Sequence, residues 1–187
     1  MTMFFLRCFL CAALAGWFVS CGSTDQFYRL SASEGAATGS SAGVSVSVGP
    51  VSLPAYIDRA ELVFQNGTNE FPVPSNVRWL GSLPENISRV LAENLGHVLH
   101  SSRVRSSLET GFTPRYQVAL DVRQFHGISG REAILDVSWR ILSGGEVLSR
   151  QSALFHEPIV GDGYGPLVAA ESRLLEQCAL AIAQSLP

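Results

Sequence analysis

The chain has 187 residues, of which 16 are acidic and 13 basic, and its formal net charge is −3 at pH 7. All of the basic residues are arginine and none is lysine. Because a surface that binds nucleic acid needs clustered positive charge to displace counterions from phosphates, this composition argues against nucleic-acid binding.

The first two dozen residues have the layout of a bacterial lipoprotein signal. One arginine precedes an apolar run (residues 8–19) that is too short to span a bilayer comfortably, and Ser20 then precedes Cys21. We therefore expect residues 1–20 to be removed and Cys21 to carry acyl chains that anchor the protein. Gly22 is not the aspartate that would favour the inner membrane, so we expect anchoring at the outer membrane, facing the periplasm. The alternative is an ordinary secretory signal with an incidental cysteine.

Removal of the signal leaves about 167 residues, a comfortable size for one domain with a substantial core. Of the four cysteines, Cys8 and Cys11 leave with the signal and Cys21 is the anchor, so Cys178 has no disulfide partner within the domain. The fold must therefore be stabilised by its core alone.

A short FYRL segment, residues 27–30, follows the anchor. Residues 31–43 are almost entirely Ser, Ala, Gly and Thr, a composition that predicts a linker or mobile loop. The sequence leaves open whether residues 27–30 join the fold. We thus expect a lipidated N-terminus with a short strand and linker over 21–43 and the domain itself over 44–187.

The first part of this domain reads as β-rich. Strict apolar and polar alternation over 44–48, stopped by Gly49-Pro50, predicts a half-buried strand. Residues 62–64 and 70–73 flank an Asn66-Gly67 pair, a pattern that predicts a hairpin.

The strongest helix pattern begins at Ser82, which has Glu85 three residues later as in a capping box, with Pro84 tolerated in the first turn. Apolar residues then recur at helical spacing, and we expect the helix to end near Ser101. The apolar positions are Ile87, Val90, Leu91, Leu95, Val98 and Leu99.

Three further strand patterns follow. Residues 116–122, 133–141 and 147–155 contain alternating apolar positions and are separated by turns at 127–130 and at Gly144-Gly145. This arrangement predicts an antiparallel meander.

A second helix is expected to open at Gly165-Pro166, with apolar positions that run to Ile182. Together the patterns predict an α/β fold: a single, three-layer-like domain with a mixed, mostly antiparallel sheet of about six strands and two main helices.

Glycines at 161, 163 and 165 lie between a strand and a helix, the context of phosphate-binding loops. Their spacing lacks the required final glycine interval, and the chain lacks the lysine of a P-loop, so we interpret a turn. His97 and His100 have no carboxylate or cysteine at ligand spacing, and we expect a solvent-side pair rather than a metal site. The sequence indicates no cofactor and no metal.

No serine or cysteine stands in a context typical of a catalytic nucleophile. Cys178 falls on the apolar face of the last helix and is expected to be buried and inert. Asp121 and Asp136 lie on neighbouring strands near Arg123 and Arg140, which predicts cross-strand ion pairs. We therefore do not expect an enzyme.

A binding surface is the more natural expectation. Arginine and aromatic residues on connecting segments are typical of protein interfaces, although some of them cover core edges. The strongest candidates are Tyr56, Arg59, Arg78 and Trp79. Ile57 and Phe71 belong to the same set, which we expect to be exposed.

Two segments, VGPVSLPAYIDRAELVFQ (48–65) and RWLGSLPENISRVLAENLG (78–96), resemble the PqiC-like family of ABC-type transport auxiliary lipoproteins. The YRL after the anchor and YQVALDVRQF (116–125) with the following ILDVSWRIL fit the same pattern, so the resemblance covers nearly all of the mature chain. Ala60-Glu61 departs from the Pro-Gln that relatives often carry.

The resemblance implies a three-layer α/β fold and a non-catalytic outer-membrane subunit of a trans-envelope lipid transport system that supports membrane integrity. Its expected partners are a periplasmic MCE-domain (mammalian cell entry) protein, an inner-membrane permease and, in ABC versions, an ATPase; a ring-like homo-oligomer is also compatible. The alternatives are a lipid-anchored carrier with an acyl chain between helix and sheet, and a structural lipoprotein of another outer-membrane complex.

Overall fold

The computed structural model describes residues 24–34, 43–106 and 111–187. Within them the chain forms eight strands and two helices. In chain order these are β1 (Gln26–Tyr28), β2 (Val46–Ser52), β3 (Phe64–Gln65), β4 (Val77–Trp79), α2 (Leu83–Val98), β5 (Val104–Ser106), β6 (Tyr116–Ile128), β7 (Glu132–Ser143), β8 (Glu146–Pro158) and α3 (Tyr164–Ser185).

Six of the strands form one mixed sheet, called here the large sheet, in the order β5-β2-β6-β7-β8, with β3 paired to β6. The long pairs β6–β7 and β7–β8 are antiparallel, whereas β2 pairs in parallel with both β5 and β6, and β3 pairs in parallel with β6. The predicted antiparallel meander is therefore confirmed, and the shorter strands add the parallel pairs.

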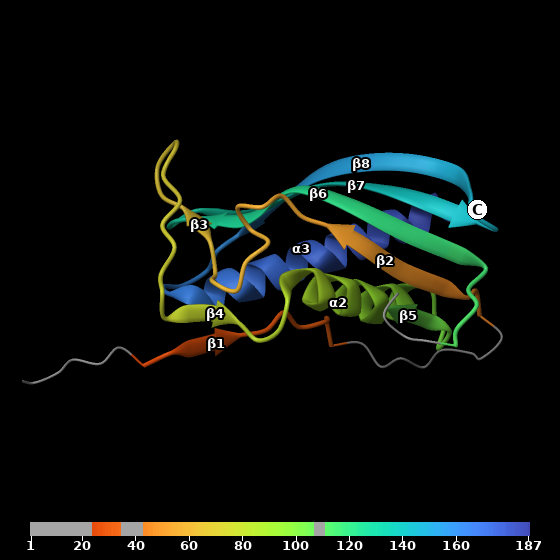
Figure 1. Ribbon diagram of the computed structural model, residues 1–187, viewed down its shortest axis with the longest axis horizontal. Helices are drawn as coiled ribbons and strands as arrows, with labels where there is room; N and C mark the ends of the chain where they lie inside the picture. Colours follow the sequence, from red (N-terminus) through yellow and green to blue (C-terminus); the bar gives the residue numbers. More distant parts are fainter. Residues whose placement is uncertain (1–23, 35–42, 107–110) are drawn as a thin grey trace, which may run out of the picture.

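Both helices cover one face of the large sheet and pack against each other (Figure 1). On α2 the apolar positions predicted from the sequence are buried from Ile87 to Leu95, and on α3 Leu174, Leu175 and Cys178 have no exposed surface. These side chains and the inward residues of β2, β6 and β7 form one continuous core.

A third layer lies on the other side of the helices. Strands β1 and β4 form a parallel two-stranded sheet, called here the small sheet, which pairs Tyr28 with Trp79. The helices therefore separate the large sheet from the small sheet (Figure 1). The expected three-layer, single-domain α/β fold with two main helices and a mixed sheet is confirmed.

The segment after β1 crosses both helices instead of starting a free linker. The Ser31 N–H donates to Ser172 Oγ on α3, and the Ser33 N–H donates to Asn94 Oδ1 on α2. Leu30 has no exposed surface, and its carbonyl accepts a 2.7 Å hydrogen bond from Arg89. Residues 27–30 thus join the fold, and the linker expectation is wrong for residues 31–33; residues 1–23 and 35–42 lie outside the described part.

The hairpin predicted around Asn66-Gly67 is not formed. The turn itself exists, since Gly67 has φ +70° and Asn66 bridges to Glu70. The returning chain contains Pro72 and Pro74, which have no N–H to donate to a ladder, so pairing stops after one bridge. Phe64 and Gln65 pair instead with β6.

The first helix begins as predicted, with the Ser82 side chain accepting from the Glu85 N–H, but it ends at Val98, before the expected Ser101. His100 stands in the left-handed region with φ +46° and closes the helix. In the described part of the chain no helix is both long and apolar enough to cross a membrane.

Candidate functional site

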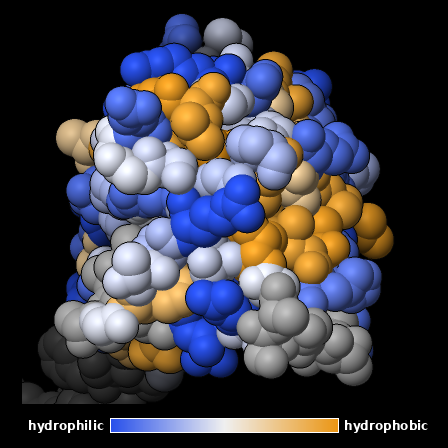
Figure 2. Space-filling view, turned by 90° about the vertical axis from the view of Figure 1, so that its right-hand side faces the viewer, coloured by the Kyte–Doolittle hydropathy of each residue, from blue (hydrophilic) through white to orange (hydrophobic). Residues whose placement is uncertain are grey.

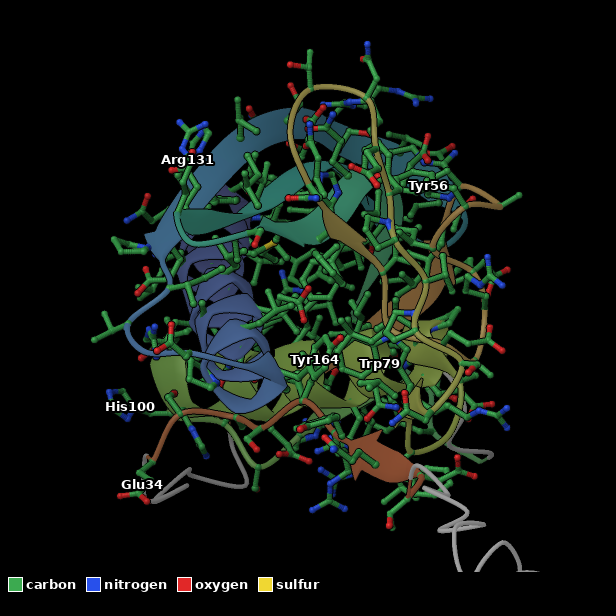
Figure 3. The ribbon with its side chains drawn as sticks, turned by 90° about the vertical axis from the view of Figure 1, so that its left-hand side faces the viewer. Glu34, Tyr56, Trp79, His100, Arg131 and Tyr164 are labelled. Atoms are coloured by element: carbon green, nitrogen blue, oxygen red, sulfur yellow. The ribbon has the colours of Figure 1, made fainter. Side chains whose placement is uncertain are left out.

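The predicted interface residues divide into three groups in the structure. Tyr56, Arg59 and Phe71 lie together around a surface groove. Arg78 of β4 does not line the groove but is bridged to Glu61, the partner of Arg59. The expected exposure of Ile57 and Trp79 is wrong, because they are only 2% and 5% exposed and belong to the core. In Figure 3, Tyr56 lies in the upper part of the molecule and Trp79 lies well below it.

The groove has a volume of about 490 Å³ and lies between the segment after β2, the segment before β4, and β6. Its apolar and aromatic members come from the two connecting segments and its polar members largely from β6. The lining residues are Tyr56, Arg59, Val63, Phe71, Val73, Arg123 and Gln124.

An irregularity in β6 places two consecutive side chains at the groove. The register with β7 shifts between Val122 and Gln124, so Arg123 is the extra residue of a bulge. A bulge re-aims side chains that regular alternation would send to opposite faces. The sequence pattern assigned Arg123 to an ion pair alone, and neither it nor Gln124, Val63 or Val73 was predicted at the site.

Three rings support the groove from inside. Tyr56 and Phe71 meet edge to face with centroids 5.6 Å apart, and each also packs edge to face on His126 of β6. Such arrangements place the positive ring edge of one aromatic on the negative face of another. Phe71 therefore belongs to a packed cluster even though it is 40% exposed.

The hydrogen-bond contacts of His126 indicate the tautomer of its neutral ring. Its Nε2 lies 3.3 Å from Gln65 Oε1, which can only accept, so Nε2 carries the proton. Its Nδ1 is then the acceptor for the Tyr56 hydroxyl at 3.2 Å. Burial lowers the pKa of His126 below its ordinary value, which keeps the ring neutral. Burial also raises the pKa of Tyr56 and keeps its hydroxyl protonated.

Two arginines stand at the rim of the groove, each held by a carboxylate. Arg59 Nε is 3.0 Å from Glu61, and Arg123 Nε is 2.8 Å from Asp136 across the β6–β7 pair. The hydrogen bond from Arg59 lowers the pKa of Glu61, and the bond to Asp136 raises that of Arg123. Their side chains stay 42% and 49% exposed, so guanidinium donors remain available to an incoming acceptor.

The cross-strand ion pairs predicted for β6 and β7 are thus found in one case. Arg123 pairs with Asp136, while Arg140 lies directly opposite Arg150 of β8 and forms no ion pair with any of the described residues.

The remaining candidates from the sequence do not assemble a chemical site. Cys178 is fully buried, and burial raises its pKa to about 12. The glycine-rich segment before α3 forms a turn in which Gly163 caps the helix without a side-chain hydrogen bond. Among the residues that the structure describes, no three His, Cys, Asp or Glu side chains are placed to hold a metal ion.

A separate set of exposed apolar side chains, Val147, Leu148 and Leu180, belongs to the start of β8 and the last turns of α3. Figure 2 shows this end of the molecule, where hydrophobic residues gather on one side. None of the predicted interface residues belongs to this set.

Comparison with known proteins identifies the fold and the family. A family model described as "ABC-type transport auxiliary lipoprotein component" matches residues 28–183. A search of curated proteins finds no match. The crystal structure of an uncharacterised protein is similar over 88% of this chain and all of that one, with 19% identity and a TM-score of 0.73. A Xanthomonas campestris protein is similar over 84% and 92% of the two chains, with 15% identity and a TM-score of 0.65.

A third structure, of a PelC dodecamer from Paraburkholderia phytofirmans, gives a TM-score of only 0.45 at 13% identity, over 76% of this chain and 90% of that one. At these identities the first two structures support the fold alone.

Proposed function

Because the chain belongs to the family of ABC-type transport auxiliary lipoproteins, we propose that it is a non-catalytic, outer-membrane lipoprotein that docks the periplasmic MCE-domain component of a trans-envelope lipid transport system. The inner-membrane permease and ATPase of that system would be indirect partners, and lipid would move through them and the MCE component. Such a role supports membrane integrity without requiring chemistry from this chain.

The observation that carries this proposal is the groove. It combines an apolar and aromatic floor, formed by Val63, Phe71 and Val73, with a rim of exposed arginines. Protein interfaces combine an apolar, aromatic centre with a polar rim, and aromatic and arginine side chains are enriched among the residues that carry most of the binding energy. Its aromatic cluster is fixed by packing and by the Tyr56–His126 hydrogen bond, so the free protein loses little conformational entropy on binding.

The lipid-carrier alternative needs room for an acyl chain between the helices and the large sheet. That layer is filled in the structure: Leu91, Leu95 and Leu174 have at most 1% exposed surface and pack against inward residues of the sheet. The groove, by contrast, is open at the surface. The packing therefore favours docking over carriage.

The proposal is tested by extracting the acylated protein from its native envelope in mild detergent and identifying co-purifying proteins and lipids by mass spectrometry. We expect an MCE-domain protein. Arg59→Glu reverses the charge at the groove rim and should reduce recovery of this partner at least about tenfold, the range in which interface hot spots act.

Arg131→Glu is the matched control, because Arg131 is a 70% exposed arginine outside the groove. It should leave recovery unchanged. Stoichiometric phospholipid without an MCE-domain partner would contradict docking and establish the carrier, and a different outer-membrane complex would indicate a structural role. The native mass of the extract tests the expected homo-oligomer.

A further inference from the structure

The outward face of the small sheet carries apolar side chains that are more than half exposed. Phe27 of β1 is 57% exposed, and Leu80, directly after β4, is 55% exposed. The backbone hydrogen bond from Leu80 N–H to the Tyr28 carbonyl (2.7 Å) continues the pairing of β1 with β4 beyond Trp79.

The strand register places these residues on one face. Phe27 is paired with Arg78, and the next outward position brings Arg29 beside Leu80. The alternate residues Val77 and Trp79 point inward and are buried. On this outward face, two apolar and two cationic side chains alternate across β1 and β4, and Glu61 borders them through its bridge to Arg78.

The length of chain before β1 decides what this face meets. Only five residue steps separate Cys21 from Gln26, the first residue of β1. A fully extended chain spans at most about 3.6 Å per residue, so β1 begins within about 18 Å of the cysteine. If Cys21 carries the acyl chains, the small sheet is held next to the membrane, and the large sheet lies beyond the helices (Figure 1).

We infer that the outward face of the small sheet is the surface with which the domain rests on its own membrane, with Phe27 and Leu80 entering the headgroup region of the bilayer. This inference shares with the proposed function only the acylation of Cys21. The anchor already holds the protein, so these side chains set its orientation and do not have to supply affinity.

The contact is mainly apolar. Arg29 and Arg78 can reach lipid phosphates, but Glu61 forms a backbone bridge with Arg78, and its carboxylate offsets part of that charge. Arg78 is also partly engaged, since its Nε donates to the Ser75 carbonyl. Aromatic and aliphatic side chains flanked by cations are typical of proteins that lie in a membrane interface.

The test uses the full acylated protein in vesicles of phosphatidylethanolamine and phosphatidylglycerol. Single nitroxide labels are attached to Phe27→Cys, Leu80→Cys and Leu154→Cys. Leu154 is the matched control, because it is also 57% exposed but belongs to β8 in the large sheet. The native Cys178 is fully buried and does not compete for the label.

Collision of each nitroxide with oxygen, which concentrates in lipid, is compared with collision with a water-soluble nickel complex. We expect the ratio of oxygen to nickel collisions to be roughly threefold or more higher at positions 27 and 80 than at 154. Equal ratios at all three positions would overturn the inference. Shielding of 27 and 80 in native envelopes but not in protein-free vesicles would also overturn it, because a protein would then cover this face.

The mass of the reconstituted protein separates this inference from the proposed function. If the acyl mass is present and both labels remain in water, only the membrane-contact surface is rejected, and docking through the groove is unaffected. If the acyl mass is absent, the anchor is lost and this inference falls with it.

Discussion

Glu171 is a carboxyl group inside the protein, on the buried side of α3. It is 1% exposed, and its Oε2 has no hydrogen-bond partner among the described residues. Burial therefore raises its pKa well above the ordinary value, because water stabilises the ionised form and the protein interior does not. A carboxyl group with these surroundings is kept in its neutral form.

The neutral state of Glu171 makes stability depend on pH. Its pKa is higher in the folded than in the unfolded protein, so its contribution is fully present below the unfolded value of about 4.3 and is lost as the pH rises through the folded value. Glu171→Gln, which never ionises, should remove this loss. We expect the melting temperature of the variant, relative to the native protein, to rise between pH 4.5 and pH 8; a pH-independent difference would contradict the assignment.

Trp79 and Arg59 were predicted from the sequence to have the same role, and the structure separates them. Trp79→Ala would leave a cavity beneath the small sheet and should lower the free energy of unfolding by about 3–5 kcal/mol. Arg59→Ala removes an exposed side chain and should leave the free energy of unfolding nearly unchanged. Urea denaturation of both variants checks this, and equal destabilisation would mean that Arg59 also supports the fold.

At the scale of elements, the sequence predicts the start of α2 correctly but not its end. The start is encoded by familiar residues: Ser82 caps the helix by accepting from the Glu85 N–H at 3.4 Å, and Pro84 stands in the first turn. Because these residue types rarely serve another purpose in this order, the sequence alone located this boundary.

The cap at Ser82 can be tested directly. Ser82→Ala removes the acceptor and should lower the free energy of unfolding by about 0.5–1 kcal/mol, the lower part of the range for such caps because the hydrogen bond is long. Ser82→Asp keeps an acceptor and should retain most of the stability. If chemical denaturation gives the same loss for both variants, the side-chain cap does not contribute.

The end of α2 was predicted three residues too late. The Ser101 N–H donates to the Gly96 carbonyl and the His100 N–H to the His97 carbonyl, which is the pattern of a Schellman motif. Its left-handed position normally holds glycine, but here it holds His100. The end of the helix was therefore missed because no glycine occupies the left-handed position. The glycine of this motif, Gly96, lies at its beginning, where its carbonyl accepts from the Ser101 N–H.

The segment between β2 and β4 shows why the groove escaped prediction. Its turn residues were recognised, but the partner of Phe64 and Gln65 is β6, more than 60 residues away. Pairing between segments so distant in sequence leaves no local pattern. The aromatic residues Tyr56 and Phe71 could be nominated from composition, whereas their neighbours Val63, Arg123 and Gln124 depend on this long-range pairing.

At the scale of the whole molecule, the two sheets lie on opposite sides of the helices (Figure 1). The small sheet begins a few residues after Cys21, the proposed anchor, whereas β6 of the large sheet lines the groove. A protein anchored by its N-terminus in this orientation would present the groove to the periplasm. The fold class was accessible from the sequence because periodicity and turn residues agree for the long elements; the small sheet was not, because three-residue strands have too little periodicity to read.

The anchor itself is tested by Cys21→Ala. Without a cysteine to acylate, the domain has no remaining membrane attachment of comparable strength, since each buried methylene of a lipid anchor contributes about 0.8 kcal/mol. We expect the variant in the soluble periplasmic fraction and the cells to become more permeable to detergents. Retention of the variant in the outer-membrane fraction would argue against acylation as the anchor.

The central claim is that the groove receives an MCE-domain protein, and site-specific photocrosslinking in cells measures this most directly. A photoreactive amino acid at Phe71, in the groove, should form a covalent product containing an MCE-domain protein, whereas the same amino acid at Leu154 should not. Crosslinking to that protein from both positions equally, or from Leu154 alone, would contradict docking through the groove. So would the absence of any MCE-domain product.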